Sequence, residues 1–411
     1  MAEALDDAAL FDRVQAHTIR WFWERGDPLS GMAPDRDASE PGVVTTGGSG
    51  FAMMALIAGI ERGLLSREDV RDRIALMVTT LERVDRFHGA WSHWLDARSG
   101  RAVPFGELDD GGDLVETAFV VQGLLTARSY FDRPEEADLR GRLDALWRGV
   151  EWDFYKAPDD AVLLWHWSPN HGFAMNHAIR GWNECLIVYV LAAASPTHPI
   201  EPALYHRGWT DSPDFRNGRT ELGVELPLGP PLGGPLFFAH YSFLGLDPRG
   251  LVDRYADYWL QNQRHVALNR AWCLANPNQC AGYGPDCWGL TASDHEGGYS
   301  AHAPGAETDL CVIAPTAAIA SFPYAPDWAM QAMRAFHDRL GERIWTDWGF
   351  TDAFCESGGW YSDTHLAIDQ GPIAIMMENH RSGLLWDLFM RAPEIATGLA
   401  RLGFSRVPLM A

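Results

Sequence analysis

Carboxylic acids lie in the polar loops that lead into a series of apolar segments. Hydrolysis of a glycosidic bond needs two carboxyl groups, one that protonates the leaving oxygen and one that activates water or attacks the sugar. The acids that precede or open these apolar segments are Asp109, Asp110, Asp113, Glu116, Glu184, Glu307, Asp309 and Asp369. If the loops converge in the fold, the set supplies such a pair.

A purely structural explanation competes for each acid. Asp113 and Glu116 have the spacing of a capping box, and acidic residues favour helix N-termini because of the helix dipole. The surroundings of Glu184 favour a site, because they are more polar and aromatic than a cap requires. The residues near it are His166, Trp167, Arg180, Trp182 and Asn183.

The local environments suggest different roles for the acids. A helix N-terminus lowers the pKa of a carboxyl group, which suits Asp113 and Asp369 as a general base or as substrate ligands. A general acid needs a pKa raised by apolar burial. Glu184 follows Trp182 and precedes an apolar run, so it is the best candidate if desolvation outweighs the dipole. An ion pair with Arg180 would oppose that role.

Aromatic residues are abundant, with 18 Trp and 12% aromatic residues overall. A pyranose has apolar C–H faces and a polar rim, so aromatic rings beside polar groups suit a sugar, although core packing is an equal alternative for any single Trp. The predicted substrate-binding residues are Asp109, Trp165, His166, Trp167, Arg180, Trp182, Asn183, Trp288, Trp360 and Tyr361.

Charge and hydropathy exclude several classes of partner. The formal net charge is −22, which disfavours nucleic acid and anionic membrane surfaces but leaves a neutral glucan possible. No apolar run reaches the roughly 20 residues that span a bilayer. No signal peptide is visible, so we expect a cytoplasmic protein, or a periplasmic or secreted one if a leader was removed. The oligomeric state is not readable.

The elements that must position the acids recur along the chain. Six segments are apolar nearly all round, as buried helices are; they are Ser49–Gly63, Asp113–Phe131, Trp182–Ser195, Pro235–Leu246, Pro315–Ser321 and Pro372–His380. Amphipathic segments alternate with them, namely Leu5–Glu24, Arg67–Arg86, Pro134–Tyr155, Pro248–Arg264, Ala325–Leu340 and Leu384–Leu402. Three of the apolar segments carry Pro near the first helical position.

This alternation predicts an all-α fold, an (α/α)6 barrel with six inner and about six outer helices, as a single domain over residues 1–411. A helical bundle or a superhelix of helix pairs is the alternative. Parallel inner helices would place all their N-termini, and therefore the acidic loops, at one mouth. The segment Ser212–Gly234 is expected to be a loop with a short strand around Glu221–Leu226.

The six cysteines form no C-x-x-C pair, so a structural zinc site is not expected. Free buried thiols are favoured, although Cys273, Cys280 and Cys287 share one segment and could form a disulfide in an oxidising compartment. Several potential metal ligands share one loop, namely His295, Glu296, His302, Glu307 and Asp309. Inverting glycosidases need no metal, so we predict neither a catalytic metal nor a cofactor.

Several long motifs resemble one family. They are Asp113–Phe119, Gly123–Arg128, Trp165–Pro169, Arg180–Glu184, Ser195–His198, Trp288–Asp294, Ala314–Ala318, Ser321–Tyr324, Ile368–Pro372 and Glu378–Leu385. Together they are similar to the bacterial glycoamylase-like proteins, which include the endo-β-1,2-glucanases of glycoside hydrolase family 144. The resemblance extends from about Gly47 to Leu385.

The resemblance implies an (α/α)6 barrel that hydrolyses β-1,2-glucosidic bonds with inversion, with Glu184 as the general acid. Asp109, Asp113 and Glu116 match acidic positions of the catalytic cleft, and the general base stays open between Asp113, Glu116 and Asp369. The run Asp309–Ile313 departs from the expected small, glycine-containing run, so chain-length preference or the balance of hydrolysis and transfer could differ.

Other activities remain open at this stage. On the same barrel, the protein could be an exo-acting, sophorose-releasing enzyme or a β-1,2-glucosyl transferase. A sugar epimerase or isomerase would rely on pairs of histidines, for which the candidates are His166, His171, His177, His295, His302 and His365. A glucan-binding protein without catalysis is a third class.

Overall fold

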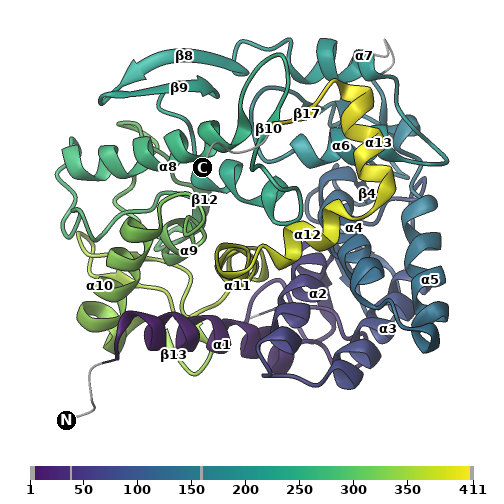
Figure 1. Ribbon diagram of the computed structural model, residues 1–411, viewed down its shortest axis with the longest axis horizontal. Coiled ribbons are helices and arrows are strands. Elements are labelled where there is room, and N and C mark those ends of the chain that lie inside the picture. The colour runs from purple at the N-terminus through teal and green to yellow at the C-terminus, as the bar shows by residue number, and fades with distance from the viewer. Residues whose placement is uncertain (1–4, 38, 158–160, 408–411) are drawn as a thin grey trace.

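The computed structural model describes residues 5–37, 39–157 and 161–407, and helices dominate it (Figure 1). One hydrophobic core extends from Leu10 to Phe404. Helices are arranged in two concentric layers around that core, and α11 is seen almost end-on near the middle of the view. The inner layer positions the loops that carry the acids.

The inner helices are buried on all sides, which confirms what their continuous apolar character predicts. They are α2 (Thr46–Glu61), α4 (Leu114–Tyr130), α6 (Leu186–Ala194), α9 (Pro315–Ile319) and α11 (Ala367–Arg381), with the 3-10 turns η4 (Leu236–Ala239) and η5 (Tyr241–Phe243) between α6 and α9. Helix α11 packs on α2, and α2 packs on α4, which closes the ring.

Glycine permits the close approach of α2 and α4. A Cβ atom at Gly123 would lie 2.4 Å from the carbonyl oxygen of Gly50, and one at Gly50 would lie 2.3 Å from the carbonyl oxygen of Phe119. Any larger residue at either position would force the two backbones apart. Gly50 and Gly123 therefore fix the spacing of the two helices whose N-termini carry Gly47 and Asp113.

The outer helices are amphipathic. They are α1 (Asp7–Arg25), α3 (Arg67–Arg83), α5 (Ala137–Arg148), α8 (Tyr258–Ala275), α10 (Pro326–Ile344), α12 (Leu384–Met390) and α13 (Pro393–Leu402). Several of them, such as α1, α3, α5 and α10, lie at the perimeter in Figure 1. Short helical segments η1 (Pro134–Glu136), η2 (Trp152–Tyr155), α7 (Pro202–Leu204) and η3 (Tyr205–Trp209) join them. The two layers confirm the predicted (α/α)6 barrel.

The fourth inner segment forms two 3-10 turns instead of the continuous helix expected over Pro235–Leu246. Side chains from neighbouring helices take the backbone groups that a helix would pair internally. Gln122 bonds the carbonyl of Tyr241 at 3.1 Å and the N–H of Gly245 at 3.1 Å. Trp386 donates to the carbonyl of Phe243 at 2.7 Å. These bonds satisfy the backbone in a non-helical path.

Three predicted boundaries were wrong for local reasons. Helix α8 begins only at Tyr258, because Asp253 accepts the N–H groups of two following residues in a turn and Asp257 caps the helix. The last amphipathic segment is two helices, because Pro393 disfavours helical geometry in the residue before it. Helix α11 begins at Ala367, so Pro372 lies inside it rather than at its start.

Strands are short and form separate small sheets. They are β1 (Val43–Thr45), β2 (Trp94–Asp96), β3 (Ala102–Val103), β4 (Gly112–Asp113), β5 (Leu163–Leu164), β6 (His166–Trp167), β7 (Ala178–Ile179), β8 (Arg216–Glu221), β9 (Val224–Leu228), β10 (Leu251–Val252), β11 (Ala292–His295), β12 (Gly298–Ala301), β13 (Trp345–Thr346), β14 (Gly349–Phe350), β15 (Phe354–Cys355), β16 (Trp360–Tyr361) and β17 (Ser405–Arg406).

The hairpin β8–β9 corrects the strand expected over Glu221–Leu226. Leu222 and Gly223 both have positive φ, at 50° and 80°, so the chain turns in the middle of that segment. This pair of residues with positive φ is typical of a two-residue hairpin turn.

In the described part of the chain, every helix is too short or too polar to cross a bilayer.

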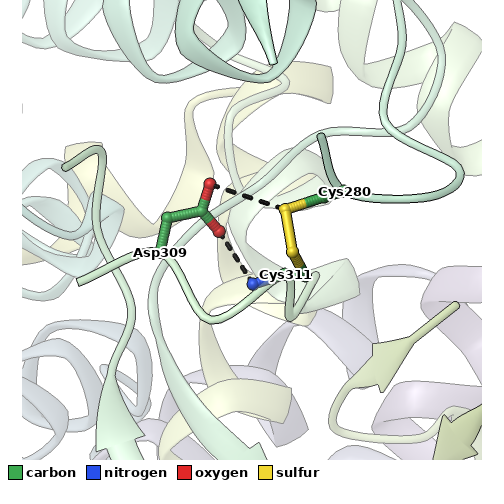
Figure 2. Close-up of side chains that lie close together, drawn as sticks. All are labelled: Cys280, Asp309 and Cys311. Carbon is green, nitrogen blue, oxygen red and sulfur yellow. Dashed lines mark hydrogen bonds between the residues drawn. A yellow bond between two sulfur atoms is a disulfide. The ribbon is translucent and has the colours of Figure 1, made fainter. Parts of the chain in front are cut away.

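A disulfide joins Cys280 to Cys311, which corrects the expectation of free thiols at these two positions (Figure 2). Cys185, Cys273, Cys287 and Cys355 are free. The cysteines near Cys280 in the chain, Cys273 and Cys287, are not its partner, which comes from the segment before α9. Two cysteines separated by 31 residues meet because the buried Asp309 carboxylate accepts the Cys311 N–H at 2.9 Å and the Trp272 indole N–H at 2.8 Å.

Candidate active site

The N-terminal ends of the inner segments meet at one end of the barrel. The N–H of Gly47, at the start of α2, donates to Glu116 of α4 at 2.7 Å. The Thr316 hydroxyl, at the start of α9, donates to the Asp369 carbonyl of α11 at 2.8 Å. The Ser242 hydroxyl of η5 donates to the Glu184 carbonyl. Acids far apart in sequence therefore become neighbours, as the barrel predicts.

Asp113 is the most heavily bonded of these acids. Its Oδ1 caps α4 by accepting the N–H groups of Val115 and Glu116, both at 2.9 Å. Its Oδ2 lies 3.5 Å from Nδ1 of His93 and 3.6 Å from Nε2 of His166. The two-residue pairing of β4 with β6 sets His166 directly opposite Asp113.

These contacts fix the charges of the cluster. Burial alone would raise the pKa of Asp113, but hydrogen bonds from His166 and His93 outweigh it and hold the pKa well below its usual range. Burial likewise opposes a charged imidazole, yet Asp109 and Asp113 raise the pKa of His166 to about 9. The Asp109 carboxylate lies 3.2 Å from Nε2 of His166. Asp113 is therefore ionised beside two protonated histidines.

Asp109, Asp113 and His166 also have the composition of a metal-binding set, with ligand atoms within 4.8 Å of one another. When His166 is protonated, its Nε2–H group is the donor that both carboxylates face.

Glu184 has the environment of a proton donor. It lies in the turn before α6, partly buried, and Asn183 shapes that turn by accepting the N–H of Cys185 at 2.9 Å. Burial raises the pKa of Glu184 to about 7, and the negative charge of Asp113 acts in the same direction. Among the described residues no ion pair joins it to Arg180, which is exposed. Desolvation therefore prevails over the helix dipole here.

Asp369 forms a buried carboxyl pair with Asp352. Burial raises the pKa of Asp369 well above its usual value and the neighbouring Asp352 adds to the shift, so the lowered pKa expected from its place in the first turn of a helix was wrong. Asp352 accepts the N–H of Asp294 at 2.7 Å, while Asp294 binds Arg36 at 2.8 Å. Two neighbouring carboxyl groups in a poorly solvated site cannot both be ionised, so this pair holds at least one proton.

Two tyrosines border this pair. The Tyr241 hydroxyl lies 3.5 Å from Oδ1 of Asp369. Tyr299 is paired with Asp294 across the β11–β12 hairpin, so the two side chains share one face of it. Although 47% of the Tyr299 surface is exposed, its pKa is raised by desolvation and by the nearby Asp369 and Asp352. Tyr299 thus lies where solvent meets the carboxyl pair.

Glu116 completes the cluster on the α2 side. Its Oε2 accepts the Gly47 N–H and lies 3.5 Å from the Thr45 hydroxyl. Burial raises its pKa above the usual value, and the Asp113 charge adds to the shift, while His93 opposes it. Asp109, Asp113, Glu116, Glu184 and Asp369 all belong to this end of the barrel.

The predicted aromatic and polar ligands separate into two groups. Trp165 lies beside the acids, stacked on His177 at 4.9 Å between ring centroids. Trp167 points to the other side of β6, against Phe87, His88 and Phe154, and is half-buried there.

Other predicted ligands do not face the acids. Trp288 is 0% exposed and Trp182 is 2% exposed, so both are core residues, and a ligand cannot reach their rings in this conformation. Tyr361 accepts a hydrogen bond from Arg343 of the outer helix α10. Trp360 lines a separate cavity of about 380 Å³ with His295 and Leu310. Core packing was the correct alternative for Trp182 and Trp288.

Two acids expected at the mouth also lie elsewhere. Glu307 is exposed. Asp309 is buried and accepts hydrogen bonds from Trp272 at 2.8 Å and Tyr283 at 2.7 Å, beside the disulfide. Its role is to hold the segment before α9.

Sequence reasoning missed several residues of the cluster, namely Asp35, Arg36, His93, Tyr241, Asp294, Tyr299 and Asp352. His93 had a usable signal, because it lies between Trp91 and Trp94 in the loop that leads to the second inner helix. Asp352 follows a segment without helical periodicity, so nothing in the sequence placed it beside Asp369.

The Asp113 network leads to a stability prediction. Replacing Asp113 by Ala removes the α4 cap and an acceptor of two buried histidines, so the free energy of unfolding should fall by about 2–4 kcal/mol at pH 7. Because the folded pKa of Asp113 is depressed, its contribution is present above the unfolded pKa of about 4 and is lost as the pH falls further. Urea unfolding at pH 7 and pH 3 measures both effects.

Asp6→Ala is the matched control for this variant. Asp6 caps α1 by accepting the Ala9 N–H at 2.8 Å and has no histidine partner among the described residues. It should cost only about 1 kcal/mol. Equal losses in the two variants would contradict a role for the histidines.

Comparison with known proteins decides the family. The glycoamylase family model, described as "Putative glucoamylase", matches residues 176–393. The chain belongs to the glycoamylase family. Its match to the family model covers α6 to α12 and therefore includes Glu184, Asp352 and Asp369.

Two relatives extend the match to nearly the whole chain. The endo-β-1,2-glucanase of Chitinophaga pinensis, solved with sophorotriose and glucose, is 51% identical, with a TM-score of 0.95 and coverage of 98% of this chain and 99% of that one. The exo β-1,2-glucooligosaccharide sophorohydrolase (non-reducing end) of Parabacteroides distasonis is 42% identical over 97% of this glycoamylase-family chain. The chain spans 58% of the length of that relative.

Proposed function

We propose that this glycoamylase-family protein is a glycoside hydrolase that cleaves β-1,2-glucosidic bonds in β-1,2-glucan and its oligosaccharides by an inverting mechanism. The observation that carries the proposal is that a partly buried Glu184 with a raised pKa and the buried carboxyl pair of Asp352 and Asp369 lie at one barrel mouth. The names of the relatives supply the linkage, since one is an endo-β-1,2-glucanase and another a β-1,2-glucooligosaccharide sophorohydrolase.

Glu184 is the general acid in this proposal. With a pKa of about 7, its carboxyl group holds a proton below neutral pH and in about half of the molecules at pH 7, and can deliver it to the glycosidic oxygen as the bond breaks. No ion pair within the described residues fixes its charge. The Ser242 contact to the Glu184 carbonyl holds the turn that presents it.

The carboxyl pair Asp352–Asp369 is the strongest candidate for the base. Asp113 is ionised, but its oxygens already face two backbone N–H groups and two histidines, so it is a poor proton acceptor. Oε2 of Glu116 already accepts the Gly47 N–H, so this oxygen is engaged as an acceptor. Oδ2 of Asp369 and Oδ1 of Asp352 are buried and bond no other side chain or backbone group of the described structure, so they are left for the proton that the two carboxyl groups share. One shared proton leaves it a single negative charge with which to activate water.

Incubation with linear β-1,2-glucan tests the proposal. We expect new reducing ends and sophoro-oligosaccharides, and NMR of the initial products should show the α-anomer that inversion requires. β-1,3-Glucan is the control substrate and should stay intact. Absence of any product from β-1,2-glucan would refute the function, and conversion of a free sugar to its 2-epimer would favour an epimerase. Tight glucan binding without products would instead favour a binding protein.

Exo action is the second candidate, because the Parabacteroides relative releases sophorose by its name. The product pattern separates the two. An endo enzyme produces a range of oligosaccharides and a rapid fall in polymer length, whereas an exo enzyme releases sophorose alone from the start. A transferase would produce oligosaccharides longer than the substrate supplied.

The Cys280–Cys311 disulfide supports a further proposal, that the protein works in an oxidising compartment such as a periplasm. Structural disulfides persist there and are rare in the cytosol. Trapping free thiols in the protein from its native host measures the state directly. Blocked Cys280 and Cys311 support the proposal, and alkylation of both would favour the cytoplasmic alternative.

The disulfide should also contribute to stability. Replacing both Cys280 and Cys311 by Ser is expected to lower the free energy of unfolding by about 2–4 kcal/mol, because the bond closes a loop of some 30 residues in the unfolded chain. Urea unfolding with and without a reductant measures this. The free thiol Cys355 provides the control, since Cys355→Ser should be nearly neutral. Identical midpoints for reduced and oxidised wild-type protein would contradict the prediction.

A further inference from the structure

An exposed phenylalanine lies at the edge of the acidic cluster. Phe105 is 51% exposed, in the loop between β3 and β4. Its ring stacks on the His93 imidazole, with centroids 4.1 Å apart and planes inclined by 27°. His93 in turn lies 3.5 Å from Asp113. The exposed ring is thus separated from the buried carboxylate by one side chain.

The ring is held in position from several sides. The Trp94 ring lies 4.8 Å from it. The Phe105 N–H donates to the Asp109 carbonyl at 2.8 Å, and the Asp109 carboxylate binds His166. The loop therefore contacts the network around Asp113 in two ways. Its backbone bonds Asp109, and the Phe105 ring stacks on His93. A surface aromatic ring fixed in this way is preorganised for contact and loses little entropy when a ligand covers it.

The chemistry of this surface fits a neutral sugar. An aromatic ring offers a flat apolar face that matches the C–H face of a pyranose, and its position beside a charged network excludes a purely apolar ligand from the neighbouring space. With a net charge of −22, the chain disfavours an anionic ligand.

We propose that Phe105 is a stacking platform for one glucosyl unit of the bound glucan, outside the two units joined by the bond that is cleaved. The proposal rests on the proposed function. The stack on His93 places the platform on the Asp113 side of the site, so a chain that runs past Glu184 and Asp113 meets the ring as it leaves the barrel mouth.

Steady-state kinetics of Phe105→Ala on a series of sophoro-oligosaccharides and on the polymer test the platform. We expect KM to rise about 5- to 10-fold for substrates long enough to cover the ring, the loss of one stacking contact. For the shortest substrate that is cleaved, KM should be unchanged. kcat should change less than about twofold on all of them, and Phe105→Tyr should restore the wild-type KM. Leu222→Ala, at the exposed β8–β9 turn, is the control and should leave KM unchanged.

A role limited to supporting His93 predicts a different result. In that case Phe105→Ala would lower kcat equally for all chain lengths and shift its pH profile, with KM unchanged, and the platform would be refuted. An unchanged KM for every substrate would refute it as well.

Calorimetry separates this inference from the proposed function. If the wild-type protein cleaves no β-1,2-glucan, the function fails, and titration of wild-type and Phe105→Ala proteins with β-1,2-, β-1,3- and β-1,4-linked gluco-oligosaccharides still tests the platform. A 5- to 10-fold weaker affinity of the variant for any of them supports it. Equal affinity, or no binding to any of them by the wild-type protein, overturns it.

Discussion

Glu184→Gln is expected to lower kcat on β-1,2-glucan by about 100- to 10,000-fold, the usual contribution of a positioned general acid. The amide keeps the volume and polarity of the side chain, but its N–H protons are too weakly acidic to be transferred to the leaving oxygen. KM should change little, because the geometry of the site is retained. Steady-state release of reducing ends measures both constants.

The pH profile provides an independent test of the same residue. The protonated form of Glu184 is the active one and its pKa is about 7, so wild-type kcat/KM should fall as the pH rises through about 7. That alkaline limb should disappear from the residual activity of Glu184→Gln. Glu307→Gln is the matched control, because Glu307 is exposed and lies outside the cluster. Near wild-type turnover by Glu184→Gln would end the assignment.

Asp369→Asn is expected to reduce kcat by a similar 100- to 10,000-fold factor. The amide keeps the shape of the buried side chain but cannot accept a proton from water, so the Asp352–Asp369 pair loses the carboxylate oxygens that Asp369 supplies. Asp352→Asn should also reduce kcat, because it removes the other carboxyl group of the pair. Asp363→Asn changes an exposed acid close by in sequence and should leave kcat unchanged.

Stability distinguishes lost chemistry from lost folding in Asp369→Asn. A carboxyl group with a raised folded pKa contributes fully below its unfolded pKa, and that contribution is lost as the pH rises toward the folded pKa. The free energy of unfolding of the wild-type protein should therefore fall as the pH rises above about 4, and that of the variant should fall less. A variant that is inactive and also unfolds more readily than the wild type at pH 7 would contradict the assignment of Asp369 as base.

The barrel and much of the site could be predicted because both depend on local patterns. Helices such as α2 and α4 are buried on every side, so their sequences are apolar throughout, and parallel inner helices place Asp113, Glu184 and Asp369 at one mouth. The roles of these residues remain predictions that the variants above test. The family resemblance agrees with the match over residues 176–393.

The features of the fold and the site that could not be predicted depend on contacts between segments whose sequences show no helical or strand periodicity. Asp352 becomes a partner of Asp369 only because Asp294 and the short hairpins hold it there. Trp182 and Trp288 occur in glycine-rich segments that suit either a ligand or a core position, and only three-dimensional packing shows that they are buried. Cys311 pairs with Cys280 through the buried Asp309, a contact with no mark in the sequence.

Closure of the ring by α11 against α2 has a consequence for how activity arises during synthesis. Asp369 emerges from the ribosome more than 200 residues after Glu116, and until α11 docks, one apolar flank of α2 has nothing to cover it. A nascent or truncated chain that ends before α11 therefore lacks an acid of the cluster and also exposes the apolar surface of α2, which favours aggregation. Catalytic competence and protection from aggregation are acquired in one late step.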